Sequence, residues 1–120
     1  MTFEEYAGRY YVLMHDDPDL FAEMVEYHAD YFMALYGPIL ERGMRFEFVY
    51  FFEDCCFNTG PLFSPGISTS VFDRLYRKMI RFYKERGVPL ALVDSDGNVE
   101  KLAPLWLDSG FDIVFPLEIG

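Results

Sequence analysis

Acidic residues follow each of the three apolar runs that the sequence predicts to be strands. Glu53 and Asp54 follow the first run, Asp94 and Asp96 the second, and Glu118 the third. The loops that contain these acids hold no Lys or Arg. Carboxylates that lie close together must be solvated, share protons or meet a cation from a substrate or a metal. The sequence therefore predicts that these five acids form a site for proton transfer, hydrogen bonding or cation binding.

Simpler roles remain open to several residues of these loops. Asp94 and Asp96 could make only turn and cap hydrogen bonds around Gly97. Cys55 and Cys56 are adjacent, whereas zinc sites normally separate their thiolates by two or more residues, so packing at a strand end is the expected role of both. A carboxylate-rich site would prefer Mg²⁺ to zinc. The sequence has no loop of recognised metal-binding spacing, and we predict no metal ligand.

The two histidines are poor partners for a catalytic thiolate. His15 stands at a predicted helix end, and His28 lies on an apolar helical stripe, where a hydrogen-bonded core histidine is the expected outcome. Activation of a cysteine would need a nearby His or a helix N-terminus. We therefore expect neither histidine to act in nucleophilic catalysis.

Hydrophobic periodicity predicts the elements that position the acidic residues. In chain order these are helices over residues 3–15 and 18–43, a strand over 44–52, a helix over 70–87, a strand over 89–93, a helix over 98–107 and a strand over 111–115. The first strand is predicted to be buried on both faces, and residues 53–69 are predicted to form a loop. Strands that alternate with helices predict right-handed βαβ units and a parallel sheet, whose carboxyl ends share one edge.

Local signals set several of the predicted boundaries. The spacing of Thr2 and Glu5 predicts a capping box, and Asp17 is the expected cap of the second helix. Pro38 should kink or interrupt that helix, because proline lacks a donor and clashes with the preceding turn. Ser70 and Asn98 are the expected caps of the later helices.

Composition limits the class of protein. The chain has 120 residues, 52% hydrophobic, with a formal net charge of −10, which predicts one domain with a helical pair over 1–43 and an α/β part over 44–120. The negative charge disfavours nucleic acid and anionic membrane surfaces as partners. No apolar run is long enough to cross a bilayer, no leader is recognised, and adjacent cysteines suit a reducing cytoplasm. Six of the ten basic residues lie within 74–86, which favours a solvated helix face over a polyanion site.

An ordered set of short motifs resembles the uroporphyrinogen decarboxylase superfamily along essentially the whole chain. The motifs are Asp17-Pro18-Asp19-Leu20, Phe52-Glu53-Asp54, Gly60-Pro61-Leu62-Phe63-Ser64-Pro65, Val93-Asp94-Ser95-Asp96-Gly97-Asn98 and Phe115-Pro116-Leu117-Glu118. This resemblance implies a (β/α)₈ barrel of which the chain supplies three of eight strands, and therefore an internal segment that is inactive alone. It also implies that Cys55, Ser64 and Asn98 contact substrate.

The superfamily contains cofactor-free tetrapyrrole decarboxylases and corrinoid-dependent methyltransferases. The methyltransferases carry a His-x-Cys zinc pair where this chain has Asp94 and Asp96, which disfavours zinc. Acidic loops at the active-site opening of the barrel favour a neutral or cationic methylated substrate. The resemblance therefore implies methyl transfer or demethylation in a full-length enzyme. A partner would supply a corrinoid, and this segment would bind no cofactor itself. Uroporphyrinogen decarboxylation in porphyrin biosynthesis is the alternative within the superfamily.

A third hypothesis belongs to another class. The chain could be a catalytically silent α/β fragment that associates with itself. Three parallel strands leave sheet edges and apolar surface unpaired, which predicts a homodimer. The heavy load of 13 Phe and 9 Tyr fits such an uncovered surface.

Overall fold

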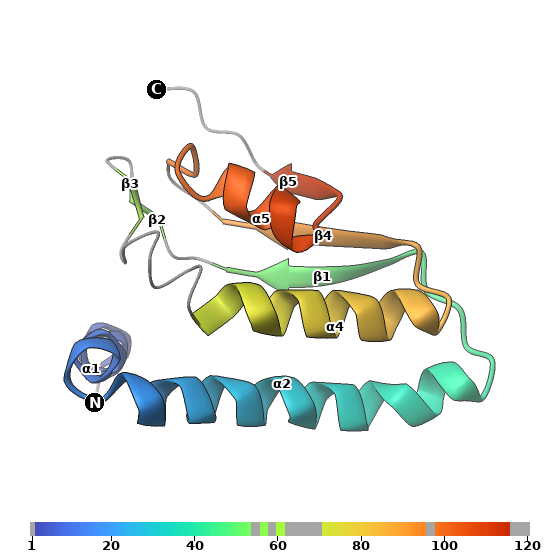
Figure 1. Cartoon of the computed structure of the whole chain (residues 1–120), viewed down its shortest axis with the longest axis horizontal. Coiled ribbons are helices and arrows are strands. Elements are labelled where there is room, and N and C mark those ends of the chain that lie inside the picture. Colours follow the sequence, from blue (N-terminus) through green and yellow to red (C-terminus); the bar gives the residue numbers. More distant parts are fainter. Residues whose placement is uncertain (1, 54–55, 58–59, 62–70, 96–97, 116–120) are drawn as a thin grey trace.

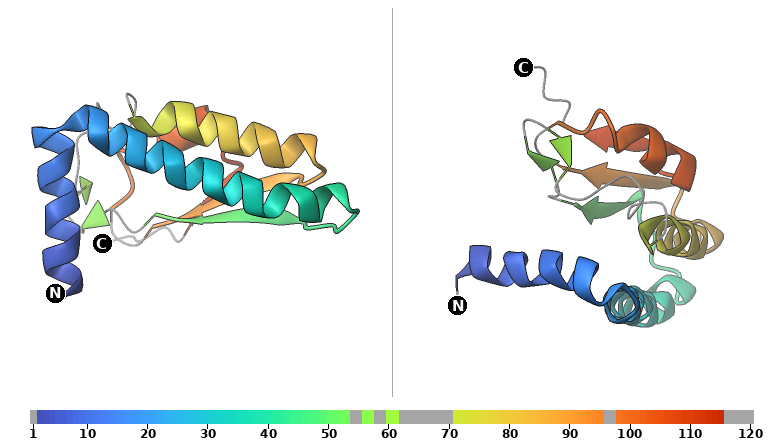
Figure 2. Two further views of the ribbon diagram at one scale, coloured as in Figure 1. Left: turned by 90° about the horizontal axis from the view of Figure 1, so that it is seen from below. Right: turned by 60° about the vertical axis from the view of Figure 1, so that its left-hand side comes forward.

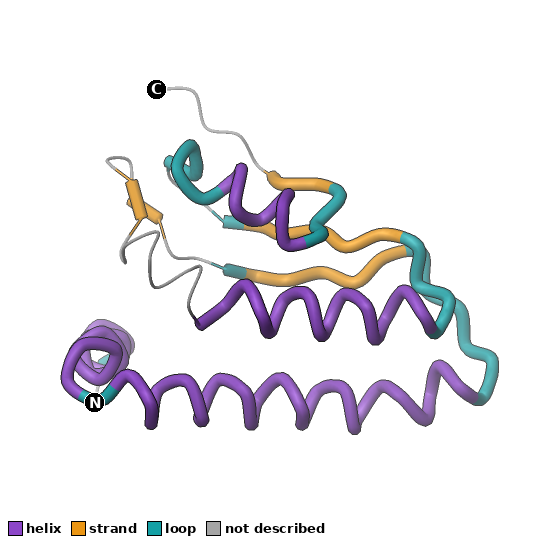
Figure 3. The backbone as a smooth tube through the Cα atoms, in the orientation of Figure 1, coloured by secondary structure: helices purple, strands orange, loops and turns teal. Residues whose placement is uncertain are grey.

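The computed structural model of the chain describes residues 2–53, 56–57, 60–61, 71–95 and 98–115. A pair of long helices precedes a small parallel α/β unit (Figure 1). Strands and helices alternate in the second half, as the tube representation makes plain (Figure 3). The predicted α/β class is confirmed, and the predicted helices and strands occur in the predicted order, with two short additional strands after the first one.

Side-chain caps start both N-terminal helices. Helix α1 (Phe3–Asp16) begins with a capping box, in which the Glu5 amide donates to Thr2 Oγ1 over 3.2 Å and the Thr2 amide donates to Glu5 Oε2 over 2.8 Å. Helix α2 (Pro18–Glu41) begins at Asp17, whose Oδ1 accepts the Leu20 amide proton over 3.1 Å. The two helices meet end to end at a steep angle (Figure 2).

Helix α2 remains helical through Pro38, so of the predicted kink or interruption the interruption is wrong. The proline removes one amide donor close to the end of the helix, where few intrahelical bonds remain to be lost. Tertiary packing supports this turn, because Gly37 and Leu40 are both buried. A Cβ at Gly37 would lie 3.1 Å from the Phe82 ring, so glycine permits this close approach.

Three parallel strands form the central sheet in the order β1-β4-β5. Their bounds are Phe48–Phe52 for β1, Leu90–Asp94 for β4 and Ile113–Phe115 for β5. Helix α4 (Asp73–Glu85) precedes β4, and helix α5 (Ala103–Ser109) joins β4 to β5. Within the region predicted to be loop, β2 (Cys56–Phe57) and β3 (Gly60–Pro61) pair as a short antiparallel ladder, which the sequence reading missed.

Helices α4 and α5 lie on the same side of the sheet (Figure 2, right), and the hydrophobic core lies between them and the strands. Phe51, Ala91 and Val93 point into this core. We call the other side of the sheet the open face. Its exposed residues are Phe48, Tyr50, Phe52, Leu90 and Ile113.

The prediction that the first strand is buried on both faces is therefore wrong for the described residues. Alternate side chains of β1 point to opposite faces, and Phe52 on the open face is 63% exposed. Its aromatic sequence suits a two-sided environment, but the helices that the structure describes cover one side. The strand also begins at Phe48 rather than at Met44.

The later helices differ from prediction at their starts. Ser70 lies outside the described residues, and no side chain of the described residues caps α4. Helix α5 begins at Ala103, with Pro104 in its first turn, and not at Asn98. Gly87 and Gly110 follow the two helices with φ of 92° and 116°, a conformation that glycine adopts without strain.

Basic residues of α4 are engaged in ion pairs within the molecule. Arg74 pairs with Glu26 over 3.1 Å and Lys78 with Asp30 over 2.9 Å, both on α2. Lys84 pairs with Asp112 over 2.9 Å. The basic face of α4 thus joins neighbouring elements. Among the described residues, no helix combines the length and apolarity needed to cross a membrane.

Candidate functional site

Backbone hydrogen bonds align the carboxyl ends of the three parallel strands. The Glu53 amide donates to the Asp94 carbonyl oxygen over 2.7 Å, and the Ser95 amide donates to the Phe115 carbonyl oxygen over 3.1 Å. The predicted shared edge of the sheet therefore exists. The side chains that leave this edge determine what chemistry it could perform.

Asp94 lies on the open face together with Tyr50. The Tyr50 hydroxyl donates a hydrogen bond to Asp94 Oδ2. The Tyr50 and Phe115 rings also lie together, with centroids 5.8 Å apart. This arrangement results from strand register, because Tyr50 pairs with Leu92 and Asp94 is two residues further along the same face. A partly exposed carboxylate beside a phenol can accept a proton, orient a polar ligand or pair with a cation.

Glu53 points to the other side of the sheet, towards helix α4. The Tyr76 hydroxyl of α4 donates a hydrogen bond to its carboxylate. Burial in apolar surroundings raises the pKa of Glu53 to about 7, and the bond from Tyr76 opposes this rise only in part. The carboxyl group can therefore exchange a proton near neutral pH, a property common in catalytic acids and bases. The apolar pattern of this helix predicts that Tyr76 packs in the core, and it does not predict the hydrogen bond from the Tyr76 hydroxyl to Glu53.

The carboxylates of Glu53 and Asp94 therefore share an edge but not a site. Phe52 pairs directly with Asp94, and Glu53 is one residue further along the strand. Because side chains alternate along a strand, this single-residue offset places the two carboxylates on opposite faces. The sequence predicts one site that contains both acids. The structure instead has two separate pairs, an open-face pair of Asp94 with Tyr50 and a helix-side pair of Glu53 with Tyr76.

Other predicted site residues have more limited roles or lie beyond description. The Asn98 side-chain oxygen accepts the Glu100 amide proton over 3.0 Å, which is a turn interaction. Ser95 is fully buried. Cys56 belongs to β2. The remaining predicted residues lie outside the described part of the chain: Asp54, Cys55, Ser64, Asp96 and Glu118.

The histidines are both exposed. His15 stands at the end of α1, as predicted. His28 is not a core residue, because the side of α2 on which it lies faces solvent. Within the described residues, no group of three or more His, Cys, Asp and Glu side chains is arranged to hold a metal ion.

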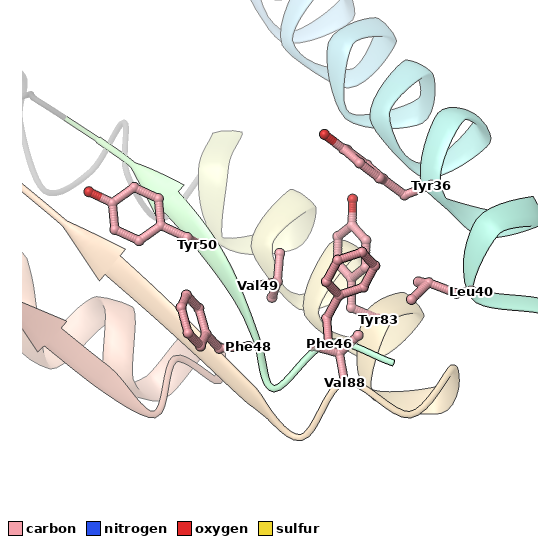
Figure 4. A pocket seen from close by; sticks show the side chains of 8 residues that line it. All are labelled: Tyr36, Leu40, Phe46, Phe48, Val49, Tyr50, Tyr83 and Val88. Atoms are coloured by element: carbon pink, nitrogen blue, oxygen red, sulfur yellow. The ribbon is translucent and has the colours of Figure 1, made fainter. Parts of the chain in front are cut away.

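An apolar groove separates helix α2 from the edge of β1. It has a volume of about 450 Å³ and is lined by residues of α2, β1 and α4, with Glu53 at the carboxyl end of the strand. We call it the α2–β1 groove. A smaller hollow of about 190 Å³ adjoins it, since Tyr36, Val49 and Tyr50 line both (Figure 4). The two hollows together follow the length of β1.

Comparison with known proteins gives no relative. No family model matches the chain, and neither the curated proteins nor the solved structures contain a match. The function of the chain has to be inferred from its own residues.

Proposed function

We propose that the open face of the sheet is part of the interior of a (β/α)₈ barrel that resembles the uroporphyrinogen decarboxylase superfamily. Two features support this proposal. Each parallel strand pairs with the next one along the chain, and both connecting helices lie on one side, as in barrels of this kind. The opposite side presents aromatic and aliphatic side chains, which fill the interior of such barrels.

The observation that carries the proposal is the position of Asp94 and Tyr50. Both lie on the open face, and Asp94 ends its strand at the carboxyl edge of the sheet. Active sites of (β/α)₈ barrels lie at this edge and on the interior face. Asp94 would accept a proton or balance a positive charge on the substrate, and the Tyr50 hydroxyl would fix the orientation of its carboxylate.

The reaction proposed is methyl transfer or demethylation of a small methylated substrate in the full-length enzyme. A carboxylate at the mouth favours a neutral or cationic substrate over a tetrapyrrole with many carboxylate arms. A corrinoid bound to a partner protein would supply the methyl-accepting cobalt. The residues of this chain would bind and orient the methylated substrate, and Asp94 would hold or move a proton at its Oδ atoms.

The test is turnover by the protein that contains this chain. Purified enzyme is supplied with cob(I)alamin and a panel of methylated amines and thiols, and methylation of cobalt is followed by its visible absorption. Asp94→Asn should lower kcat/KM by about 100-fold and Tyr50→Phe by about tenfold, while exposed Glu47→Gln should have no effect. Equal turnover by all four proteins would remove Asp94 from the mechanism. Consumption of uroporphyrinogen instead would favour the decarboxylase alternative.

The exposure of the open face favours a second candidate function. Phe48, Tyr50, Phe52, Leu90 and Ile113 are each at least 40% exposed and lie on neighbouring strands. Contiguous apolar surface of this kind marks interaction sites. A silent fragment that covers this face with a second copy of itself is therefore the competing proposal, and the oligomeric state of the chain tests it.

A further inference from the structure

The α2–β1 groove is a concave surface that meets the open face along β1, because Tyr50 and Phe52 belong to both. Phe32 and Tyr36 of α2 line one wall, Phe72 and Tyr76 of α4 line another, and the edge of β1 forms the third. The Phe72 and Tyr76 rings stack with centroids 6.0 Å apart. A volume of about 450 Å³ is within the range of small-molecule sites, and such sites are typically apolar with few polar groups.

Glu53 is the one charged residue among the described residues that line the groove. The Glu53 carboxylate accepts a hydrogen bond from the neutral Tyr76 hydroxyl. Two basic residues of α4 form ion pairs with α2, since Arg74 pairs with Glu26 and Lys78 with Asp30. The groove therefore combines aromatic walls with a carboxyl group that lacks a positive counter-charge among the described lining residues.

We propose that the α2–β1 groove binds a small apolar molecule that carries a protonated amine, with the Glu53 carboxylate as its counter-ion. The aromatic walls would enclose the apolar body, and rings beside a cation add a favourable interaction. An ammonium group would meet the carboxylate in surroundings of low polarity, where their attraction is stronger than in water. A carboxylate ligand would be repelled by the same group.

The groove and the proposed catalytic site both contact Tyr50, but they use different carboxylates. Asp94 lies on the open face, whereas Glu53 and its partner Tyr76 lie on the helix side. A ligand in the groove would not touch the Asp94 carboxylate. The two proposals can therefore fail separately, and one variant of each site distinguishes them.

The test compares three ligands of similar shape, namely tryptamine, tryptophol and indole-3-propionate, by isothermal titration calorimetry. At pH 8, tryptamine should bind the wild-type chain at least tenfold more tightly than neutral tryptophol, and indole-3-propionate should bind more weakly still. Glu53→Gln should abolish the difference between the amine and the alcohol. Phe32→Ala should weaken both by about threefold or more, because it removes part of one wall. Circular dichroism checks that each variant is folded.

Glu47→Gln is the matched control for charge, because Glu47 is exposed and does not line the groove, and it should leave all three affinities unchanged. Amine preference that survives Glu53→Gln, or that disappears in Glu47→Gln, would overturn the assignment. Failure of tryptamine to bind at millimolar concentration would also overturn it.

The pH dependence gives an independent readout. The titratable groups that line the groove are Glu53 beyond the end of β1, Tyr50 on β1, Tyr36 on α2 and Tyr76 on α4. With a pKa of about 7, Glu53 is mostly ionised at pH 8 and mostly protonated at pH 6, while the ligand amine stays charged. Tryptamine affinity should therefore fall about tenfold from pH 8 to pH 6 in the wild type. Tryptophol affinity, and tryptamine affinity for Glu53→Gln, should not follow this trend.

Discussion

The Glu53 carboxyl group makes the stability of the fold depend on pH. Burial raises its pKa to about 7 from an ordinary value of 4.5. A carboxyl group with a raised pKa binds its proton more tightly in the folded state, so its contribution to stability is full below about pH 4.5 and is lost as pH rises through 7. This loss is at most about 3.5 kcal/mol, since each unit of pKa corresponds to about 1.4 kcal/mol.

We therefore predict that Glu53→Gln stabilises the chain at pH 8 and has little effect at pH 5. The free energy of unfolding in urea should rise by about 1–3 kcal/mol at the higher pH, because the neutral amide avoids the cost of burying a charge. Trp106 is 1% exposed and is a suitable fluorescence reporter of unfolding. Exposed Glu47→Gln is the control and should show the pH dependence of the wild type. A stability difference that is the same at both pH values would refute the assignment of a charge cost to Glu53.

At the scale of elements, one buried serine joins helix α5 to helix α4. Ser109 Oγ donates its one proton to Asp73 Oδ1 over 2.5 Å, and the Leu105 carbonyl oxygen lies 2.9 Å from the same Oγ. The bond from Ser109 is the leading cause of a lowered pKa at Asp73, with a further contribution from Arg77. Ser109 itself is 4% exposed, so its hydroxyl has little access to water as an alternative partner.

Ser109→Ala should lower the free energy of unfolding by about 1–2 kcal/mol, because it removes a hydrogen bond to a charged group in a partly buried place. Asp108→Ala is a matched comparison, since Asp108 pairs with Arg77 over 2.9 Å but its side chain is 80% exposed. That variant should unfold with the same midpoint as the wild type. Guanidinium unfolding of both variants measures the difference, and equal midpoints for the two would show that the serine bond adds nothing.

The sequence predicts most elements of this fold because their signals are local. The capping box of Thr2 and Glu5 and the cap at Asp17 depend on residues three apart, and both form as expected. The start of α5 is harder to predict, because the Asn98 side chain accepts a hydrogen bond within a turn instead of capping the helix. The continuity of α2 through Pro38 depends on tertiary packing, which no local pattern contains.

The candidate site is less predictable for a related reason. Sequence order correctly places Glu53 and Asp94 at one edge of the sheet. The face to which each carboxylate points depends on the register between two strands, and a shift of one residue reverses it. Tyr76 forms the helix-side pair with Glu53, although the two residues are 23 positions apart in the sequence. Such contacts follow from packing rather than from spacing along the chain.

At the scale of the whole molecule, the aromatic residues divide into two groups. One group is packed in the core, where the Phe111 ring centroid lies 5.1 Å from those of Phe51 and Tyr76. The other lies on the open face and includes Phe48 and Phe52, which are 49% and 63% exposed. The core rings explain why the sheet and its helices fold together. The two proposals differ in what would cover the exposed rings, which is either the rest of a barrel or a second copy.

A measurement of oligomeric state separates these possibilities for the isolated chain. If a second copy covers the open face, sedimentation velocity at micromolar concentration should show a dimer. Ile113→Lys should then give a monomer, because a buried interface does not accept an unpaired charge. Leu107→Lys is the matched control, since Leu107 is 52% exposed on α5 and lies on the helix side of the sheet.

Salt should strengthen this association. Each copy has a net charge of −10, so two copies repel each other, and added salt screens that repulsion without weakening apolar contact. The dimer dissociation constant should therefore fall between about 50 and 500 mM NaCl. A monomer under all these conditions would exclude self-association as the role of the open face. A dimer that persists in Ile113→Lys, or that dissociates as salt is added, would place the contact on another surface held by charges.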